Sequence, residues 1–418
     1  MLKQEIEIMS PAGSFESLAS AIKGGANSVY FGIEQLNMRA RAANNFTKDD
    51  LCKIIEICKV KDVKTYLTVN TILYDHDLTL MKSICDEAKT VGVTAIIASD
   101  IAAIQYAHSI DLEVHISTQL NVTNMEAIRF YANFAEVVVL ARELTLQQIK
   151  HICDSIEKEQ IKGASGKLLQ IEIFAHGALC VAVSGKCYMS LATYNSSANR
   201  GACLQNCRRS YKVIDEETGD ELRIDNKYIM SPKDLCTIGF VDKILEAGVS
   251  VLKLEGRGRA PEYAYIVSKC YREAADAVLD GTYTKEKIDK WTKELETVFN
   301  RGLWHGGYYM GKKLGEWSGA YGSQAIQEKE YVGVATHCYT QAKIGEFNIE
   351  SGDLKIDDQI IIIGSSTGTI KAKVESLEID GKKVDVVAKG DKHVTIPIPE
   401  TIRKNDKLFK VINRKSNA

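Results

Sequence analysis

The chain has 418 residues, of which 45% are apolar, and its formal net charge is −2. That length exceeds one typical domain, and so small a net charge excludes nucleic-acid binding through a global positive field, so an RNA partner would need a local basic patch. The first residues are charged and lack the apolar core of a signal peptide, and no apolar run approaches a membrane span. We therefore expect a cytoplasmic protein whose eleven cysteines are reduced.

Eight short runs rich in Val, Ile and Tyr recur along the chain, with amphipathic stretches such as residues 15–25 and 51–62 between the first of them. The runs occupy residues 5–10, 28–33, 64–70, 94–99, 113–118, 136–141, 168–177 and 249–256. Each is almost continuously apolar, as in a parallel sheet buried on both faces. The alternation predicts a (β/α)8 TIM-like barrel. An open doubly wound sheet is the competing architecture, but no GxGxxG turn follows the first strand.

A cysteine-rich segment, about residues 176–240, interrupts the alternation after the seventh run. Because it follows the carboxyl end of a strand, we expect it at the face where barrel active sites are built. Helical patterning resumes over residues 261–300, and short alternating strands with turns begin near residue 329, including the hairpin signal IDGK at 379–382. We predict a barrel domain over residues 1–325 and a small β-barrel over residues 326–418.

Five cysteines fall in or directly after that segment, namely Cys180, Cys187, Cys203, Cys207 and Cys236. A zinc site would more often show paired C-x2-C knuckles, whereas iron–sulfur clusters are held by thiolates at more varied spacings. A lone cysteine is most often a small buried apolar residue, and we expect that of the other six. Five in one irregular segment indicate a metal or cluster site, and one of the five is spare if the site takes four ligands.

Three stretches closely resemble the signature of the collagenase-like peptidases of unassigned mechanism, family thirty-two of the U type. They are EIFAHGALCVAVSGKCYMS at residues 172–190, NRGACLQNCR at 199–208 and SPKDLC at 231–236. Further similar blocks lie at residues 10–32, 116–124, 138–146 and 252–265, so that the resemblance spans about residues 5–320. The terminal β-region resembles the second domain of elongation factor Tu.

The resemblance implies one of two activities. The family's older label implies proteolysis of collagen-like substrates, while its hydroxylation members carry a [4Fe–4S] cluster and act without O₂ on the tRNA wobble uridine, on an rRNA cytidine or on the ubiquinone ring. A prephenate-like organic acid is implicated as a donor in the tRNA reaction, which gives 5-hydroxyuridine. The resemblance makes Cys180, Cys187, Cys203 and Cys236 the cluster ligands, with Cys207 as the alternative.

Polar side chains at the ends of the predicted strands outline a substrate pocket. They are Asn70, Ser117, Gln119, Glu143, Glu172, His176, Lys253, Glu255 and Arg257. Alternation puts Lys253, Glu255 and Arg257 on one face of the last strand, where buried charges must be paired or catalytic. We take Glu172, His176, Lys253 and Glu255 as catalytic candidates, and an internal salt-bridge layer is the equally weighted alternative.

Basic residues gather around the cysteines and the predicted barrel mouth. They include Arg39, Arg41, Arg200, Arg208, Arg209, Lys212, Arg257 and Arg259, with Tyr188, Tyr194 and Tyr211 between them. Arginine can clamp phosphates and tyrosine can stack on bases. We take Arg39, Arg41, Gln119, Arg200, Arg208 and Arg257 as substrate-binding candidates, and an ordinary solvated surface as the alternative.

Proteolysis needs an activated nucleophile, paired acids or a hydrolytic metal. No HExxH or GxSxG motif occurs, although His176 precedes Cys180 by four residues. The sequence therefore favours oxygen-independent RNA hydroxylation, with the tRNA wobble uridine as the leading target. Peptidase activity, and hydroxylation of rRNA or a quinone, remain the alternatives.

Overall fold

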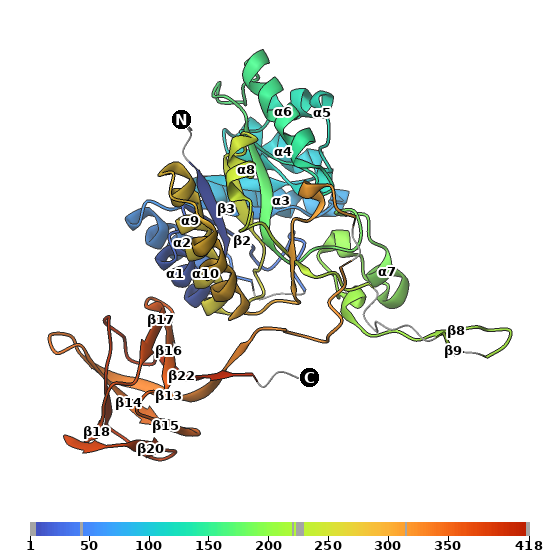
Figure 1. Ribbon diagram of the computed structural model, residues 1–418. Coiled ribbons are helices and arrows are strands. Elements are labelled where there is room, and N and C mark those ends of the chain that lie inside the picture. The colour runs from blue at the N-terminus through green and yellow to red at the C-terminus, as the bar shows by residue number, and fades with distance from the viewer. Residues whose placement is uncertain (1–5, 42–44, 220, 223–229, 314–315, 415–418) are drawn as a thin grey trace.

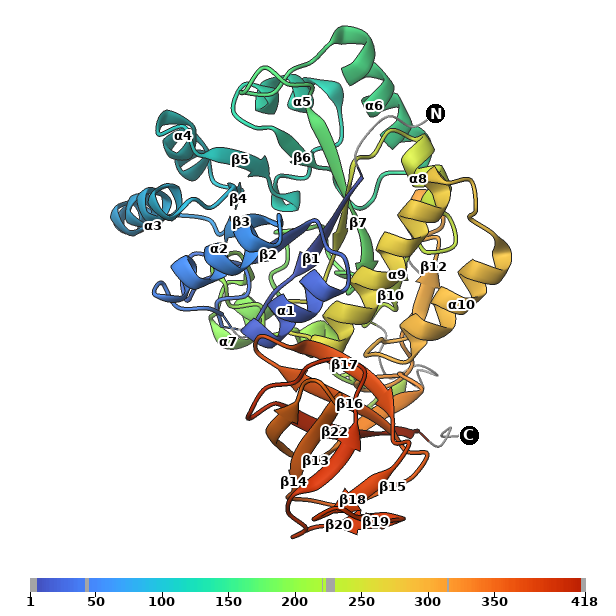
Figure 2. The same cartoon turned by 90° about the vertical axis from the view of Figure 1, so that its left-hand side faces the viewer.

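A closed barrel of parallel strands forms the larger part of this protein, whose computed structural model describes residues 6–41, 45–219, 221–222, 230–313 and 316–414. Within these residues the barrel has eight strands: β1 (Glu7–Pro11), β2 (Ser28–Phe31), β3 (Lys64–Val69), β4 (Ala95–Ala98), β5 (Glu113–Ile116), β6 (Val137–Val139), β7 (Gln170–Gly177) and β11 (Val251–Leu254). Each pairs in parallel with the next, and β11 pairs with both β7 and β1, which closes the barrel (Figure 2). The predicted fold class and all eight predicted strands are confirmed.

Helices cover the outside of the barrel. They are α1 (Phe15–Lys23), α2 (Asp50–Val60), α3 (Leu78–Val91), α4 (Ile101–Ser109), α5 (Met125–Ala132), α6 (Leu146–Glu159), α8 (Val241–Glu246), α9 (Pro261–Leu279) and α10 (Lys285–Glu296). Short polar side chains begin several of them, because a side-chain oxygen satisfies a free N–H of the first turn: Thr145 and Gln148 form a reciprocal capping box on α6. The helical region predicted over 261–300 is two helices, separated where Gly281 adopts a positive φ of 67°. No helix in the described part of the chain is long and apolar enough to cross a membrane.

Alternation along the strands separates two apolar layers. Ile8, Val29 and Leu67 belong to the large core between the strands and the helices. Their neighbours Met9 and Tyr30 belong to a smaller cluster. Because side chains point to opposite sides of a strand in turn, this smaller cluster fills the barrel interior.

The cysteine-rich segment lies between β7 and β11, as predicted. It contains α7 (Met189–Tyr194), the short turns η3 (Ala198–Arg200) and η4 (Asn206–Arg208), the small hairpin β8 (Val213–Ile214) and β9 (Glu221–Leu222), and β10 (Asp234–Cys236). Strand β10 runs antiparallel to β7 and is joined by β12 (Leu303–His305), which extends the sheet beyond the barrel. The sequence did not predict these two strands, because each is only three residues long.

The C-terminal part is an antiparallel β-domain with its own core, which contains Phe347, Ile362 and Leu408. Its strands are β13 (Gln327–Tyr339), β14 (Ile344–Ile349), β15 (Asp353–Lys355), β16 (Gln359–Gly364), β17 (Gly368–Lys373), β18 (Leu377–Ile379), β19 (Lys382–Val384), β20 (Val386–Ala388), β21 (Val394–Pro397) and β22 (Lys407–Asn413). The predicted IDGK hairpin joins β18 to β19, with positive φ at Asp380 and Gly381. Figure 1 shows this domain and the segment around α7 at the same end of the barrel.

Strand β17 attaches the C-terminal domain to α1 of the barrel (Figure 2). The hydroxyls of Ser20 and Thr369 lie 2.8 Å apart across this contact, and both residues are fully buried. Next to them Gly368 has a φ of 67°, and a Cβ there would lie 2.9 Å from the carbonyl carbon of Ala19. The two domains therefore meet too closely at this point for any side chain.

The contact makes Gly368→Ala a test of domain attachment. The positive φ alone costs an alanine about 1 kcal/mol, and the overlap with the α1 backbone adds a further 1–3 kcal/mol. Gly381→Ala is the matched control, because Gly381 has a φ of 77° and open space around it. Urea unfolding and proteolysis near residue 326 should show a clearly larger loss for Gly368→Ala. Equal losses in the two variants would contradict the contact.

Candidate functional site

A cavity of about 180 Å³ opens at the carboxyl ends of the barrel strands, beneath the cysteine-rich segment. Its wall brings together side chains from seven barrel strands or the loops that follow them, and three thiols of the insertion. Among these are Tyr30, Arg39, Asn70, Gln119, Arg142, Phe174, Cys180, Cys203, Cys207, Arg208, Lys253, Glu255 and Arg257. The structure thus assembles several of the predicted pocket residues in one place.

The cavity is strongly cationic. Five of its described lining residues are Arg or Lys, and Glu255 is the one carboxylate among them. Arg39 Nη2 lies 3.0 Å from Glu255 Oε1. Burial alone would raise the pKa of Glu255, but Arg39 and the neighbouring arginines outweigh it and hold that pKa below its ordinary value. Glu255 is therefore a carboxylate, and most of the positive charge remains unneutralised.

Arg257 is buried without a carboxylate of its own. Its guanidinium donates to Thr68 Oγ1 at 3.1 Å and to Asn37 Oδ1 at 3.0 Å, both of which are neutral acceptors. Burial lowers the pKa of Arg257 to about 10, and repulsion from Arg39 acts in the same direction. A buried cation with neutral partners favours an anionic ligand, because the ligand would supply the missing charge.

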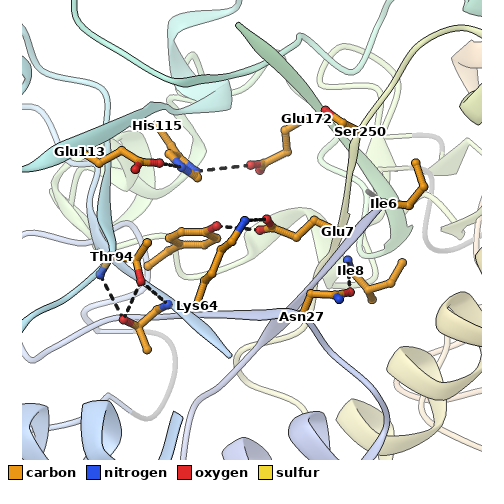
Figure 3. Close-up of polar contacts among 12 residues, drawn as sticks. Ile6, Glu7, Ile8, Asn27, Lys64, Thr94, Glu113, His115, Glu172 and Ser250 are labelled. Carbon is orange, nitrogen blue, oxygen red and sulfur yellow. Dashed lines mark hydrogen bonds and ion pairs between the residues drawn. The ribbon is translucent and has the colours of Figure 1, made fainter. Parts of the chain in front are cut away.

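Below the cavity, a line of polar side chains crosses the barrel interior. Lys253 Nζ, which lines the cavity, lies 2.6 Å from Glu172 Oε1, and Glu172 is fully buried. Figure 3 shows Glu113, His115 and Glu172 in a row, with His115 Nε2 3.1 Å from Glu113 Oε1. The other ring nitrogen of His115 lies 3.9 Å from Glu172 Oε2, and neither atom has a hydrogen-bond partner among the described residues.

A second buried carboxylate completes this layer. Glu7 accepts from Tyr66 Oη at 2.7 Å and from Lys64 Nζ at 2.8 Å (Figure 3). The Tyr66 ring in turn packs against His115, with centroids 4.4 Å apart. The barrel interior therefore holds its charges in pairs, and Lys253 connects them to the cavity.

The cysteines divide into two environments. Cys180, Cys203 and Cys207 line the cavity. Burial raises the pKa of the Cys207 thiol, and Cys180, Cys203 and Cys187 raise it further, which places four thiols in one neighbourhood. Arg208 acts in the opposite direction and favours the thiolate.

Cys236 has a different environment, in the apolar core. It is fully buried on β10, where its backbone faces His176 of β7, and burial raises its pKa to about 12. The sequence placed Cys236 with Cys180, Cys187 and Cys203; in the structure it is not among the residues that line the mouth cavity. The physical reason is that β10 extends the sheet outside the barrel, and its cysteine belongs to the apolar core.

His176 also points away from the cavity. The pairing of β7 with β11 is irregular, because Lys253 faces Phe174 while the next residue, Leu254, faces His176. An extra residue of this kind reverses which way the following side chain points, so the expected alternation from Glu172 does not reach His176. Its ring contacts Tyr271 and Tyr263 of α9, and burial lowers its pKa to about 3.

Several predicted substrate arginines have structural partners. Arg200 pairs with Asp77 and stacks on Tyr74, outside the cavity. Arg41 is exposed and lies outside it too. Arg208 does line the cavity, but its guanidinium donates to the carbonyls of Leu179 and Pro232, which tethers the cysteine-rich loop.

The sequence missed several cavity residues, among them Arg142, Phe174 and Tyr30. Arg142 donates to Ser184 Oγ at 2.8 Å and lies over the Phe174 ring, and Lys253 lies 4.8 Å from the centre of the Tyr30 ring. Arg142 directly precedes the predicted Glu143, which is exposed and outside the cavity. Arg142 directly follows the predicted strand at residues 136–141, and this position at a strand end could have marked it as a cavity residue.

Residues 13–319 match the family described as Peptidase family U32. The chain belongs to that family. It is 55% identical over 410 residues to a Porphyromonas gingivalis protein named "Collagenase", covering 98% of this chain and 99% of the relative. An uncharacterized protease of Methanocaldococcus jannaschii is 38% identical, covering 97% of this U32 chain and 98% of the relative. The tRNA hydroxylation protein P1 of Bacillus subtilis is 29% identical, covering 72% and 70%.

The Glu172–Lys253 pair yields a stability test. Lys253→Met leaves a buried carboxylate without its cation, which should cost about 3–5 kcal/mol of unfolding free energy. The double variant Glu172→Gln/Lys253→Met should recover much of that loss, because no unpaired charge remains. Lys150→Met is the control: its pair with Asp154 is exposed and should cost about 0.5 kcal/mol or less in urea unfolding. A small loss for Lys253→Met would show that the pair is not buried in solution.

Proposed function

We propose that this U32 protein holds an iron–sulfur cluster at the barrel mouth and hydroxylates a pyrimidine base of RNA, with tRNA as the first candidate substrate. The observation that carries the proposal is the shared cavity: thiols of the cysteine-rich loop line the same space as Arg39, Lys253 and Arg257. Relatives named for tRNA hydroxylation, at 29–33% identity, support this choice of substrate.

The residues present fit such a cluster by their chemistry. The thiols of Cys180, Cys187 and Cys203 all lie close enough to act on the Cys207 thiol, and iron–sulfur clusters are held by cysteine thiolates. No group of His, Cys, Asp or Glu among the described residues is placed to hold a single metal ion. A cluster differs from a single ion in this respect, because it spreads its ligands over several iron atoms. We therefore place Cys207, in preference to Cys236, in the proposed ligand set.

When bound, the cluster would supply electron transfer or an open iron site as a Lewis acid. The chain's own residues would bind and orient the reactants. Arg257, with its neutral partners, and Arg142 are suited to a carboxylate such as a prephenate-like organic acid. Tyr30 and Phe174 supply aromatic surface next to Lys253.

Peptidase activity is the second candidate, and the similarity to named relatives favours it over hydroxylation. The specific observation is the 55% identity to a protein named "Collagenase" over nearly the whole chain. The His176–Cys236 pair is a poor nucleophile and base for it, because both are enclosed and Cys236 keeps its proton at neutral pH. The thiols of Cys180 and Cys203 in the cavity would be the candidates instead.

Anaerobic purification with iron and sulfide assays tests the cluster. We expect the wild-type chain to carry iron and sulfide, and Cys207→Ser to lose most of both. Cys236→Ser should keep them, because that thiol lies in the apolar core and does not line the mouth cavity. Cys52→Ser, at an exposed helix position, is the matched control. Full iron in Cys207→Ser together with its loss in Cys236→Ser would restore the ligand set predicted from the sequence.

The substrate is tested separately. Mass spectrometry of tRNA nucleosides from a deletion strain should show loss of 5-hydroxyuridine derivatives, restored by wild-type protein and not by Cys203→Ser. Unchanged tRNA with a change in rRNA 5-hydroxycytidine or in the quinone would show that the protein is a hydroxylation enzyme with rRNA or the quinone as its substrate. An iron-free protein that cleaves denatured collagen would overturn the proposal in favour of the peptidase.

A further inference from the structure

A second cavity, of about 440 Å³, lies between the barrel and the C-terminal domain. The barrel contributes the loop from β11 to α9 and the segment after α10, and the C-terminal domain contributes β13, β16, β17 and β22. Its volume is within the range of small-molecule sites. Neither domain forms this cavity alone.

Four cations and two carboxylates line the cavity, and they do not pair off completely. Lys329 Nζ lies 2.6 Å from Glu262 Oε2, and Arg414 Nε lies 3.1 Å from Glu328 Oε2. Each of the two carboxylates therefore already has a cationic partner. Arg259 and Lys371 have no ion-pair partner among the residues that the structure describes, although Asp234 lies near Arg259 and Glu294 near Lys371, so the cavity lining itself has two more cations than carboxylates.

Arg259 is half-buried and Lys371 is exposed at the cavity. Partial desolvation of the charged groups lowers the pKa of both Arg259 and Lys371. The Arg259 guanidinium carbon lies over the Phe299 ring, 3.6 Å from its centre, and this contact helps to hold the side chain at the cavity wall. Thr297, Ser323 and Gln327 add neutral polar groups to the wall. A site with two cations that lack an ion pair, beside further polar groups, favours a doubly charged oxyanion.

We propose that this interdomain cavity is a phosphate-binding subsite, in which Arg259 and Lys371 bind the phosphate group of a nucleotide or of an RNA backbone. Phosphate fits better than a simple carboxylate because it can carry two charges and presents more acceptor oxygens. The Lys371 side chain comes from the C-terminal domain and Arg259 from the barrel, so a bound phosphate would also hold the two domains together.

The position of Arg259 links this subsite to the barrel mouth. Arg257 lines the mouth cavity and Arg259, two residues later in the same loop, lines the interdomain cavity. A nucleotide chain that places one base in the mouth could therefore place a nearby phosphate between the domains. Only this RNA source rests on the proposed function; the phosphate subsite itself does not.

Calorimetric titration of the full chain tests the subsite with two probes, inorganic phosphate and a ten-nucleotide single-stranded RNA. Lys371→Gln and Arg259→Gln should each weaken binding about tenfold, because each removes one charge-assisted contact. Lys373→Gln is the matched control: it lies two residues along the same strand, is exposed and pairs with Asp357 at 2.7 Å. It should bind as the wild type does, and circular dichroism should confirm that all variants are folded.

The outcomes separate the two proposals. Weakened phosphate and RNA binding in both variants supports the subsite with an RNA source. Weakened phosphate binding with unchanged RNA binding supports a free phosphate ligand and leaves the hydroxylation proposal to its own tests. Binding of neither probe, or equal effects of Lys371→Gln and Lys373→Gln, would overturn the subsite.

Discussion

The pairing of β11 with both β1 and β7 is the interaction on which the rest of the protein depends. It closes the parallel sheet, and closure forces alternate side chains of every strand into one shared interior. Lys253 of β11 thereby meets Glu172 of β7, although 81 residues separate them. The insertion that carries the cysteines is held over the same opening, because it leaves from β7 and returns to β11. The mouth cavity is a direct consequence of this closure.

Charged side chains are paired differently at the barrel mouth and in the barrel interior. Inside the barrel each carboxylate has a cation or a hydrogen-bond donor, as buried charges require. At the mouth Arg257 has neutral partners, and Arg39 shares the carboxylate of Glu255 with the neighbouring arginines. A surplus of positive charge in a partly enclosed space raises the free energy of the folded state, and a bound anion would lower it. Between the domains, Arg259 and Lys371 likewise lack an ion pair among the described residues.

The strand positions and the fold class could be read from the sequence because they depend on local composition. A continuous apolar run of four to eight residues between amphipathic stretches is typical of a strand in a sheet covered on both faces. The IDGK turn is equally local, since Asp380 and Gly381 adopt the positive φ that a tight hairpin needs. The candidate site was predicted only in part. Lys253, Glu255, Arg257 and Gln119 line the cavity, whereas His176 turns outward at a strand irregularity that the sequence does not mark.

The sequence by itself determined that the chain forms a parallel barrel with a cysteine-rich insertion at its seventh strand and a β-domain after it. Only the tertiary structure decided which thiols share one environment and which cations lack a partner. Cys207 and Cys236 look alike in the sequence, yet one lies at the cavity and the other in the apolar core. The physical reason is range: secondary structure follows from neighbouring residues, whereas the state of a thiol or a charge is set by groups that arrive from distant strands.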